Sequence, residues 1–225
     1  MSDLEVVAAD GRVIGERAQR TRRRLLDATA RLLGERGALG LRVVEISRES
    51  DASPATFYQY FTDVTEALLA LADEATDELD TIRALVIPSW SGDGGLVHAR
   101  QLVEAFVEYR QRNRAILRLR DLRAEEGDGR FRAVRQRGYA GLMSDLMTKV
   151  DLAKVAGRLP AAMNSYAVAG AAVAMMERLV SYQPEFERRG VDRESMTETI
   201  ALLLLNTVDG ALPCREFSVR SEPAP

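Results

Sequence analysis

The spacing of apolar residues predicts helices along almost the whole chain. A stripe at the helical period marks a first helix, which Gly34 and Gly37 bring to an end. The stripe consists of Leu25, Leu26, Ala28, Leu32 and Leu33. The chain has no run that alternates with the period of a strand, and it has no internal repeat. The pattern therefore predicts an all-α fold.

A helix, a tight turn and a second helix follow. The first is predicted over 43–49, with Val43, Val44 and Ile46 as its buried residues, and the turn over 50–52. Ser53 is suited to cap the second helix and Pro54 to its first position, where the missing amide hydrogen has no cost.

A long helix is predicted next. Asp63 and Glu66 have the spacing of a capping box, so the helix begins at Val64, and it continues to Ile87, where Pro88 stops it. Its apolar stripe consists of Leu68, Leu71, Ala72, Ala75, Leu79, Ile82 and Val86.

Beyond a glycine-rich loop at 88–95, the same period predicts further helices. They cover Leu96–Arg112, Arg114–Glu125, Asp128–Val150, Pro160–Gln183 and Asp192–Asp209. The helix over 160–183 is rich in alanine and glycine, and the helix over 192–209 is rich in leucine. In a protein outside the membrane such surfaces must be buried internally or against another subunit, so these two helices are the candidates for a homodimer interface.

Composition limits the possible classes of protein. Hydrophobic residues make up 46% of the 225 residues and charged residues 29%, as in ordinary globular proteins. We expect a cytoplasmic protein with no membrane contact, because the first sixteen residues do not resemble a signal peptide and the most apolar stretch, 166–176, is too short to span a bilayer. The single cysteine, Cys214, excludes an internal disulfide. No metal site or cofactor is expected.

The net charge of −3 conceals a basic segment near the N-terminus. Between Arg12 and Arg36 there are eight arginines against Glu16, Asp27 and Glu35, a local balance of +5. Phosphate contacts need such a cluster, but a solvated helix face explains it equally well.

The helix–turn–helix over 43–61 fits a DNA-reading motif. A helix fits the major groove, and the residues at its N-terminal end then meet base edges while hydroxyl and amide groups contact phosphates. Phe57 and Phe61, four residues apart, are expected to face back into the core.

These segments, taken together and in order, resemble the DNA-binding domain of TetR-family regulators. The resemblance covers roughly Arg17 to Asp80 and is carried by three segments of sequence. They are Thr21-Arg22…Leu25-Leu26-Asp-Ala-Thr-Ala…Gly37, Val43-Val-Glu-Ile46, and Ser53-Pro-Ala-Thr-Phe-Tyr-Gln-Tyr-Phe61.

The resemblance implies a homodimer whose paired recognition helices read a roughly palindromic operator in double-stranded DNA. It also implies a set of DNA-contacting residues, most of them at the start of the recognition helix. The set consists of Thr21, Arg22, Arg42, Ser53, Pro54, Ala55, Thr56, Tyr58, Gln59 and Tyr60.

The chain departs from the family pattern at four places. Asp51 stands in the turn where the family has glycine, and aspartate tolerates turn conformations better than most residues. Leu41 and Arg42 stand where a hydroxyl residue is frequent, Val64 where lysine is common, and Ser47 where alanine is common. The changes at Leu41 and Val64 remove phosphate contacts, which the arginines of the first helix can replace.

The family resemblance also implies that the C-terminal helices bind a small apolar or amphipathic effector and that this releases a repressor from its operator. Aromatic and methionine residues at helical spacing are candidates to line the pocket, although most stripes of this kind are ordinary core. They are Phe106, Tyr109, Phe131, Tyr139, Met143, Met147, Met163 and Tyr166.

Three other functions stay open at this stage. An enzyme is disfavoured because His98, the only histidine, has no acid, base or metal ligand near it in sequence, and because 125–128 looks like an inter-helix turn. The second function is that of an interaction protein with this fold and weakened DNA binding. The third is that of a transcriptional activator.

The expected organisation comprises a three-helix reading domain, a connecting helix and a helical effector domain between two tails. The ranges are 1–16 for a flexible tail, 17–63 for the helix-turn-helix domain, 64–87 for the connecting helix, 88–95 for the loop, 96–212 for the effector-binding and dimerisation domain, and 213–225 for the C-terminal tail.

Overall fold

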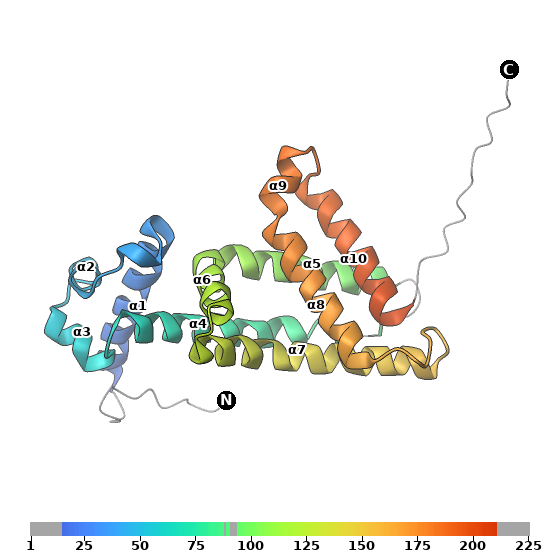
Figure 1. Ribbon diagram of the computed structural model, residues 1–225, viewed down its shortest axis with the longest axis horizontal. Coiled ribbons are helices and arrows are strands. Elements are labelled where there is room, and N and C mark those ends of the chain that lie inside the picture. The colour runs from blue at the N-terminus through green and yellow to red at the C-terminus, as the bar shows by residue number, and fades with distance from the viewer. Residues whose placement is uncertain (1–14, 88, 91–93, 211–225) are drawn as a thin grey trace, which may run out of the picture. The chain divides into compact units, whose positions relative to one another are not determined.

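The chain is helical throughout the residues that the computed structural model describes, which are 15–87, 89–90 and 94–210 (Figure 1). No strand occurs in this part of the chain, so the predicted all-α class is confirmed. The predictions for residues 1–14, Pro88 and Cys214 lie outside the described residues. The helices are α1 (Glu16–Arg36), η1 (Ala38–Gly40), α2 (Val43–Glu49), α3 (Pro54–Tyr60), α4 (Val64–Arg83), α5 (Gly95–Arg112), α6 (Arg114–Glu125), α7 (Gly129–Val155), α8 (Ser165–Ser181), α9 (Gln183–Arg188) and α10 (Arg193–Asp209).

Three predicted helices differ from the observed ones at their C-terminal ends. The helix predicted over 128–150 continues to Val155. The helix predicted to reach Ile87 ends at Arg83, because the Leu85 and Val86 N–H groups donate to carbonyls three residues back and form a tighter turn. The predicted 160–183 helix is interrupted near its end. Because Pro184 cannot continue the hydrogen-bond ladder of α8, the chain begins a separate short helix, α9, which the sequence analysis missed.

The described residues pack into two compact units, and the chain passes between them within α4, α5 and α7. One unit contains the residues up to 81 together with 108–141. The other contains 82–107 and the residues from 142 onward. Residues 108–141 pack in the first unit with the N-terminal helices, where α6 lies against α1. The predicted effector-binding domain over 96–212 stays a prediction.

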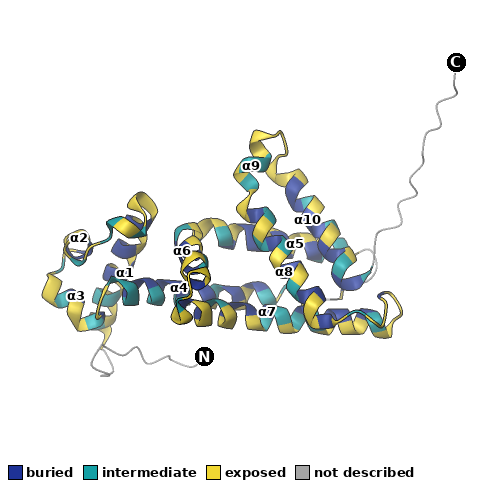
Figure 2. Ribbon diagram, viewed as in Figure 1, coloured by how far each residue is buried: buried dark blue, intermediate teal, exposed yellow. Residues whose placement is uncertain are grey.

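The first unit has the predicted apolar core. Every residue of the predicted α1 stripe is buried, and so is the stripe of α4 (Figure 2). In α2 the prediction is partly wrong: Ile46 is buried, but Val44 is 66% exposed and the buried face carries Ser47 instead. Gly138 of α7 lies close to α4, where a Cβ atom would come within 2.9 Å of the Thr76 Cγ2 atom. The absence of a side chain at Gly138 therefore sets the approach of the two helices.

The second unit is built around the pair α8 and α10, which lie side by side. Asn164 caps the start of α8 by accepting a hydrogen bond from the Ala167 N–H at 3.0 Å. Gly210 ends α10 in the left-handed conformation that favours glycine. Near this end, Arg158 donates to the Asp209 carboxylate at 2.7 Å. These contacts fix the ends of the two helices.

Candidate nucleic-acid interface

The start of α3 has the predicted capping geometry. The Ser53 Oγ atom accepts a hydrogen bond from the Thr56 N–H at 3.0 Å and lies 2.9 Å from the Thr56 Oγ1 atom. Pro54 occupies the first turn, where no hydrogen-bond donor is needed. The tight turn before the helix places Asp51 at φ 52°, in the left-handed region that favours glycine. The aspartate thus adopts, in this turn, a conformation that glycine adopts without strain.

The helix α3 turns one face inward and leaves its leading edge open to solvent. Phe57 and Phe61 are buried, as predicted, with ring centroids 5.5 Å apart. Tyr58 is 55% exposed on the opposite face. Ser53, Pro54, Ala55 and Gln59 are also exposed, and Thr56 and Tyr60 are half-buried. The residues expected to read DNA therefore lie together on the accessible edge of one helix.

Three further candidate contacts lie outside α3, and they are Arg42, Thr21 and Arg22. Arg42 is exposed at the residue before α2 and makes no capping bond there. Thr21 is half-buried on α1, and its hydroxyl group donates to the Arg17 carbonyl at 3.1 Å. A hydroxyl group engaged in this way needs to rotate before it can donate to a phosphate oxygen.

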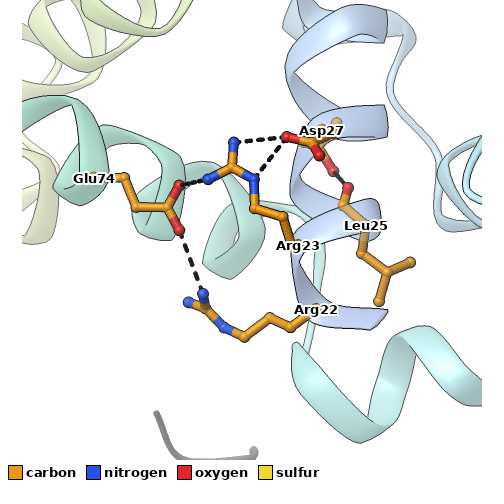
Figure 3. Close-up of polar contacts among 6 residues, drawn as sticks. Arg22, Arg23, Leu25, Asp27 and Glu74 are labelled. Atoms are coloured by element: carbon orange, nitrogen blue, oxygen red, sulfur yellow. Dashed lines mark hydrogen bonds and ion pairs between the residues drawn. The ribbon is translucent and has the colours of Figure 1, made fainter. Parts of the chain in front are cut away.

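The arginines of α1 are mostly paired within the protein. Arg22 and Arg23 both bind the carboxylate of Glu74 in α4, at 3.4 Å and 2.8 Å (Figure 3). Arg23 also binds Asp27 at 2.6 Å, and the Arg22 guanidinium lies 5.4 Å from the centroid of the Phe61 ring. Figure 3 shows the Glu74 side chain reaching both arginines.

Two other arginines of α1 bind carboxylates of α2. Arg31 lies 2.7 Å from Glu49, and Arg36 lies 2.9 Å from Glu45. The local charge of +5 is thus partly neutralised by carboxylates from other helices. Sequence reasoning missed Glu74 because it is separated from its two partners by about fifty positions and belongs to an ordinary charged helix face.

The candidate pocket residues are divided between the two compact units. Tyr109, Phe131 and Tyr139 belong to the first unit, and Phe106 belongs to the second; all four are buried. The second unit also holds the half-buried methionines Met143, Met147 and Met163 and the 67% exposed Tyr166. The exposure of Tyr166 places this residue on the surface of the single chain, where it lines no internal cavity.

A buried arginine lies among the aromatic residues of the first unit. Arg120 of α6 is completely buried, donates to the Asp121 carboxylate at 2.8 Å and lies 5.4 Å from the centroid of the Tyr139 ring. Burial raises the pKa of Tyr109 to about 12, and the charge of Arg120 acts in the opposite direction. The sequence does not predict this cluster, because its only signal is an arginine on the apolar face of a helix.

The residues considered for catalysis do not form a reactive arrangement. His98 lies on α5 with its Nδ1 atom 3.1 Å from the Ser89 carbonyl oxygen. The segment 125–128 joins α6 to α7, as predicted. Within the described ranges, no three histidine, cysteine or carboxylate side chains gather as metal ligands would. None of the helices in those ranges combines the length and apolar character that crossing a membrane requires.

Comparison with known protein families gives two matches. Residues 82–215 match the family described as Tetracyclin repressor-like, C-terminal domain, which alone covers more than half of the chain. Residues 25–71 match the family described as Bacterial regulatory proteins, tetR family. A comparison with curated proteins gives no match.

Several solved structures have a similar fold. The fatty acid degradation regulator FadR from Bacillus halodurans is 15% identical, with 86% of this chain and 97% of that chain covered and a TM-score of 0.64. GusR from Salmonella enterica is 19% identical, with 84% and 95% covered and a TM-score of 0.65. The multidrug binding protein EbrR, solved with imidazole, is 18% identical, with 86% and 97% covered and a TM-score of 0.56.

Proposed function

The chain belongs to the TetR family of bacterial regulatory proteins, and from this premise we propose that it is a homodimeric repressor that a small ligand releases from its operator. The family and its fold make the chain a DNA-binding transcriptional regulator. Repression, the dimer and the release by ligand are the parts proposed. Repression is preferred because the matched C-terminal family is described as repressor-like.

The exposed leading edge of α3 is the observation that carries the proposal. Ser53 and Thr56 present hydroxyl groups at the start of the helix, and Tyr58 presents a phenol one turn later. Hydroxyl and phenol groups donate hydrogen bonds to phosphates, and a helix of this kind fits the major groove. Because the buried side of α3 holds Phe57 and Phe61, the helix can enter a groove without losing its own packing.

The homodimer is supported by the outer surfaces of α8 and α10. On α8 the exposed positions include Ala167, Ala171 and Ala174, which are spaced at the helical period and carry no charge. On the neighbouring α10, Leu203 is 44% exposed. Small residues permit close approach of helices, and an apolar surface of this kind is costly to leave in water. A second copy of the same pair would cover both helices with twofold symmetry.

The proposed effector is a small apolar or amphipathic molecule. Within the first unit, the buried aromatic residues Tyr109, Phe131 and Tyr139 supply suitable surface for its pocket. The structurally similar EbrR is described as a multidrug binding protein and was solved with imidazole, which favours ligand binding by this fold. The helix α4 runs without interruption from Val64 to Arg83, so a shift of α4 on ligand binding would move the reading helices. A coupling free energy of about 1–3 kcal/mol between effector binding and DNA binding suffices to change DNA affinity roughly 5- to 150-fold.

The pairing of Arg22 and Arg23 with Glu74 favours a second candidate function. If these arginines stay bound to Glu74, fewer positive charges are available to DNA, and the chain is an interaction protein with weakened DNA binding. A transcriptional activator has the same DNA-reading surface and differs only in the effect on the promoter.

Titration of the purified protein with DNA from upstream of its own gene tests the proposal. We expect protection of a roughly palindromic site, with an affinity that falls steeply as salt rises, because phosphate contacts release counterions. Tyr58→Ala should weaken binding about tenfold or more, the cost of losing a hydrogen bond to a charged group. Tyr182→Ala, which removes a tyrosine at the end of α8, is the matched control and should bind normally. Salt-insensitive binding, or equal affinity of both variants, would favour the interaction protein.

A further inference from the structure

A cleft of about 400 Å³ opens between α1, α4 and α6, and all its lining residues belong to the first compact unit. Its volume is within the range of small-molecule sites. The cleft is separate from the exposed edge of α3, and it contains none of the aromatic and methionine residues proposed above for the effector pocket.

The cleft has an apolar floor. Leu33 of α1, Leu71 and Ala75 of α4 and Ile116 of α6 line it, and all four are buried in the core apart from the surface that faces the cleft. A ligand with an apolar body would cover this remaining surface and remove it from water, which is favourable.

The rim of the cleft is acidic. Asp77 and Glu78 lie one turn after Glu74 on α4, and the guanidinium groups at the rim are those of Arg23 and Arg112. The guanidinium of Arg22, which is outside the cleft lining, also binds Glu74. An anionic ligand would be repelled by the carboxylate that remains unpaired within the described residues, that of Asp77.

Two of the three carboxylates already have cationic partners. Glu74 binds Arg23, and Glu78 accepts hydrogen bonds from Arg112 at 3.3 Å and from the Asn113 amide at 3.0 Å. Asp77 has no such partner among the residues that the structure describes. Partial burial raises the pKa of Asp77, and the nearby charge of Asp80 raises it further. Asp77 is exposed to solvent and is therefore the one carboxylate of the rim that an incoming cation can reach and neutralise.

We propose that the cleft between α1, α4 and α6 is a binding site for an organic ammonium ion with a short apolar body. The ammonium group pairs with Asp77 at the rim, and the body lies on Leu71, Ala75 and Ile116. A bare metal ion is a poorer occupant, because the described residues supply no group of three metal ligands. The proposal is tested independently of DNA binding, since the titrations contain no operator DNA.

Three probes with one body and different head groups test the site. They are 4-phenylbutylamine, 4-phenylbutan-1-ol and 4-phenylbutyrate, each titrated into the full chain by calorimetry at low salt. We expect the amine to bind up to about fivefold more tightly than the alcohol, a difference typical of a charge pair near a surface, and the carboxylate to bind more weakly than the alcohol. Equal binding of amine and alcohol, or no binding of the amine at millimolar concentration, overturns the proposal.

Two variants and one control locate the binding. Asp77→Asn should remove the preference for the amine and leave the affinity for the alcohol unchanged. Ala115→Phe should fill the apolar part of the cleft and weaken all probes that bind. Glu104→Gln removes the same charge from an exposed residue of α5 that does not line the cleft, and it should behave as the unchanged protein. An amine preference that survives Asp77→Asn, or amine binding that survives Ala115→Phe in a folded protein, places the ligand elsewhere and refutes the site.

Discussion

The Nη1 atom of Arg23 in α1 lies 2.8 Å from the Oε2 atom of Glu74 in α4, and the same carboxylate binds Arg22. A carboxylate and a DNA phosphate compete for the same guanidinium groups, because both accept paired hydrogen bonds from arginine. If Arg22 and Arg23 contact DNA, Glu74 limits the number of positive charges that α1 can offer to it.

Removing this carboxylate should strengthen DNA binding. We expect Glu74→Gln to bind both operator and unrelated DNA more tightly. The slope of log K against log salt concentration should become steeper by about one to two, because each new phosphate contact adds about 0.9 to its magnitude. Fluorescence anisotropy between about 50 and 200 mM salt measures the change over a range in which such contacts matter. Glu78→Gln, which removes a carboxylate one turn along α4, is the control. Unchanged slopes for both variants would show that Arg22 and Arg23 make no phosphate contacts.

The left-handed Asp51 gives a test of the turn between α2 and α3. Asp51→Gly should leave the free energy of unfolding within about 1 kcal/mol, because glycine adopts this conformation without strain but loses more entropy on folding. Asp51→Val should lower the free energy of unfolding by about 1–3 kcal/mol, since a β-branched residue is strained at positive φ. Urea unfolding followed by circular dichroism measures both changes. Equal stability of the glycine and valine variants would contradict the turn geometry.

The proposed dimer predicts that a charge on the outer face of α8 separates the subunits. Ala171→Glu should shift the protein to monomer, because it places two carboxylates in an apolar interface without partners. Sedimentation velocity at micromolar concentration distinguishes the two states. Ala133→Glu, at an exposed residue of α7, is the control and should remain a dimer. A dimeric Ala171→Glu protein would move the interface away from this face.

The close approach at Gly138 predicts opposite effects for two glycine substitutions in α7. Gly138→Ala should destabilise the protein by about 1–3 kcal/mol, because the new Cβ atom would press on Thr76. Gly129→Ala meets no neighbouring atom within 4 Å and should be neutral or stabilise the helix by up to about 1 kcal/mol. Thermal unfolding of the two variants beside the unchanged protein gives the comparison. A Gly138→Ala protein as stable as Gly129→Ala would rule out tight packing between α4 and α7.

The recognition helix, α3, was predictable because the sequence features that define it are local. Ser53 caps it, Pro54 occupies its first turn, and Phe57 and Phe61 lie four residues apart on its buried face. Each of these features depends on residues that are close in sequence, and the structure confirms all of them. The start of α4 at Val64 was predictable for the same reason, since Asp63 accepts a hydrogen bond from the Glu66 N–H at 2.8 Å.

Contacts between distant segments were not predictable from the same patterns. Nothing in the sequence distinguishes Glu74 from the other carboxylates of α4, and its role depends on where α1 packs. Arg120 is buried although its neighbours in sequence include exposed charges, because α6 turns it toward Tyr139. Val44 was predicted to be buried and is exposed, because α2 is short and contacts α1 and α3 through the face that carries Ile46 and Ser47.

The hydroxyl groups of Ser53 and Thr56 have a shared consequence for phosphate recognition. The two oxygen atoms lie 2.9 Å apart, so one hydroxyl hydrogen is used between them. Of the two hydroxyl hydrogens, one remains for an outside acceptor, and the pair acts toward a DNA backbone as a single donor. Losing Ser53 and losing Thr56 should therefore disturb one and the same phosphate contact, and the double replacement should cost less than the sum of the two single ones.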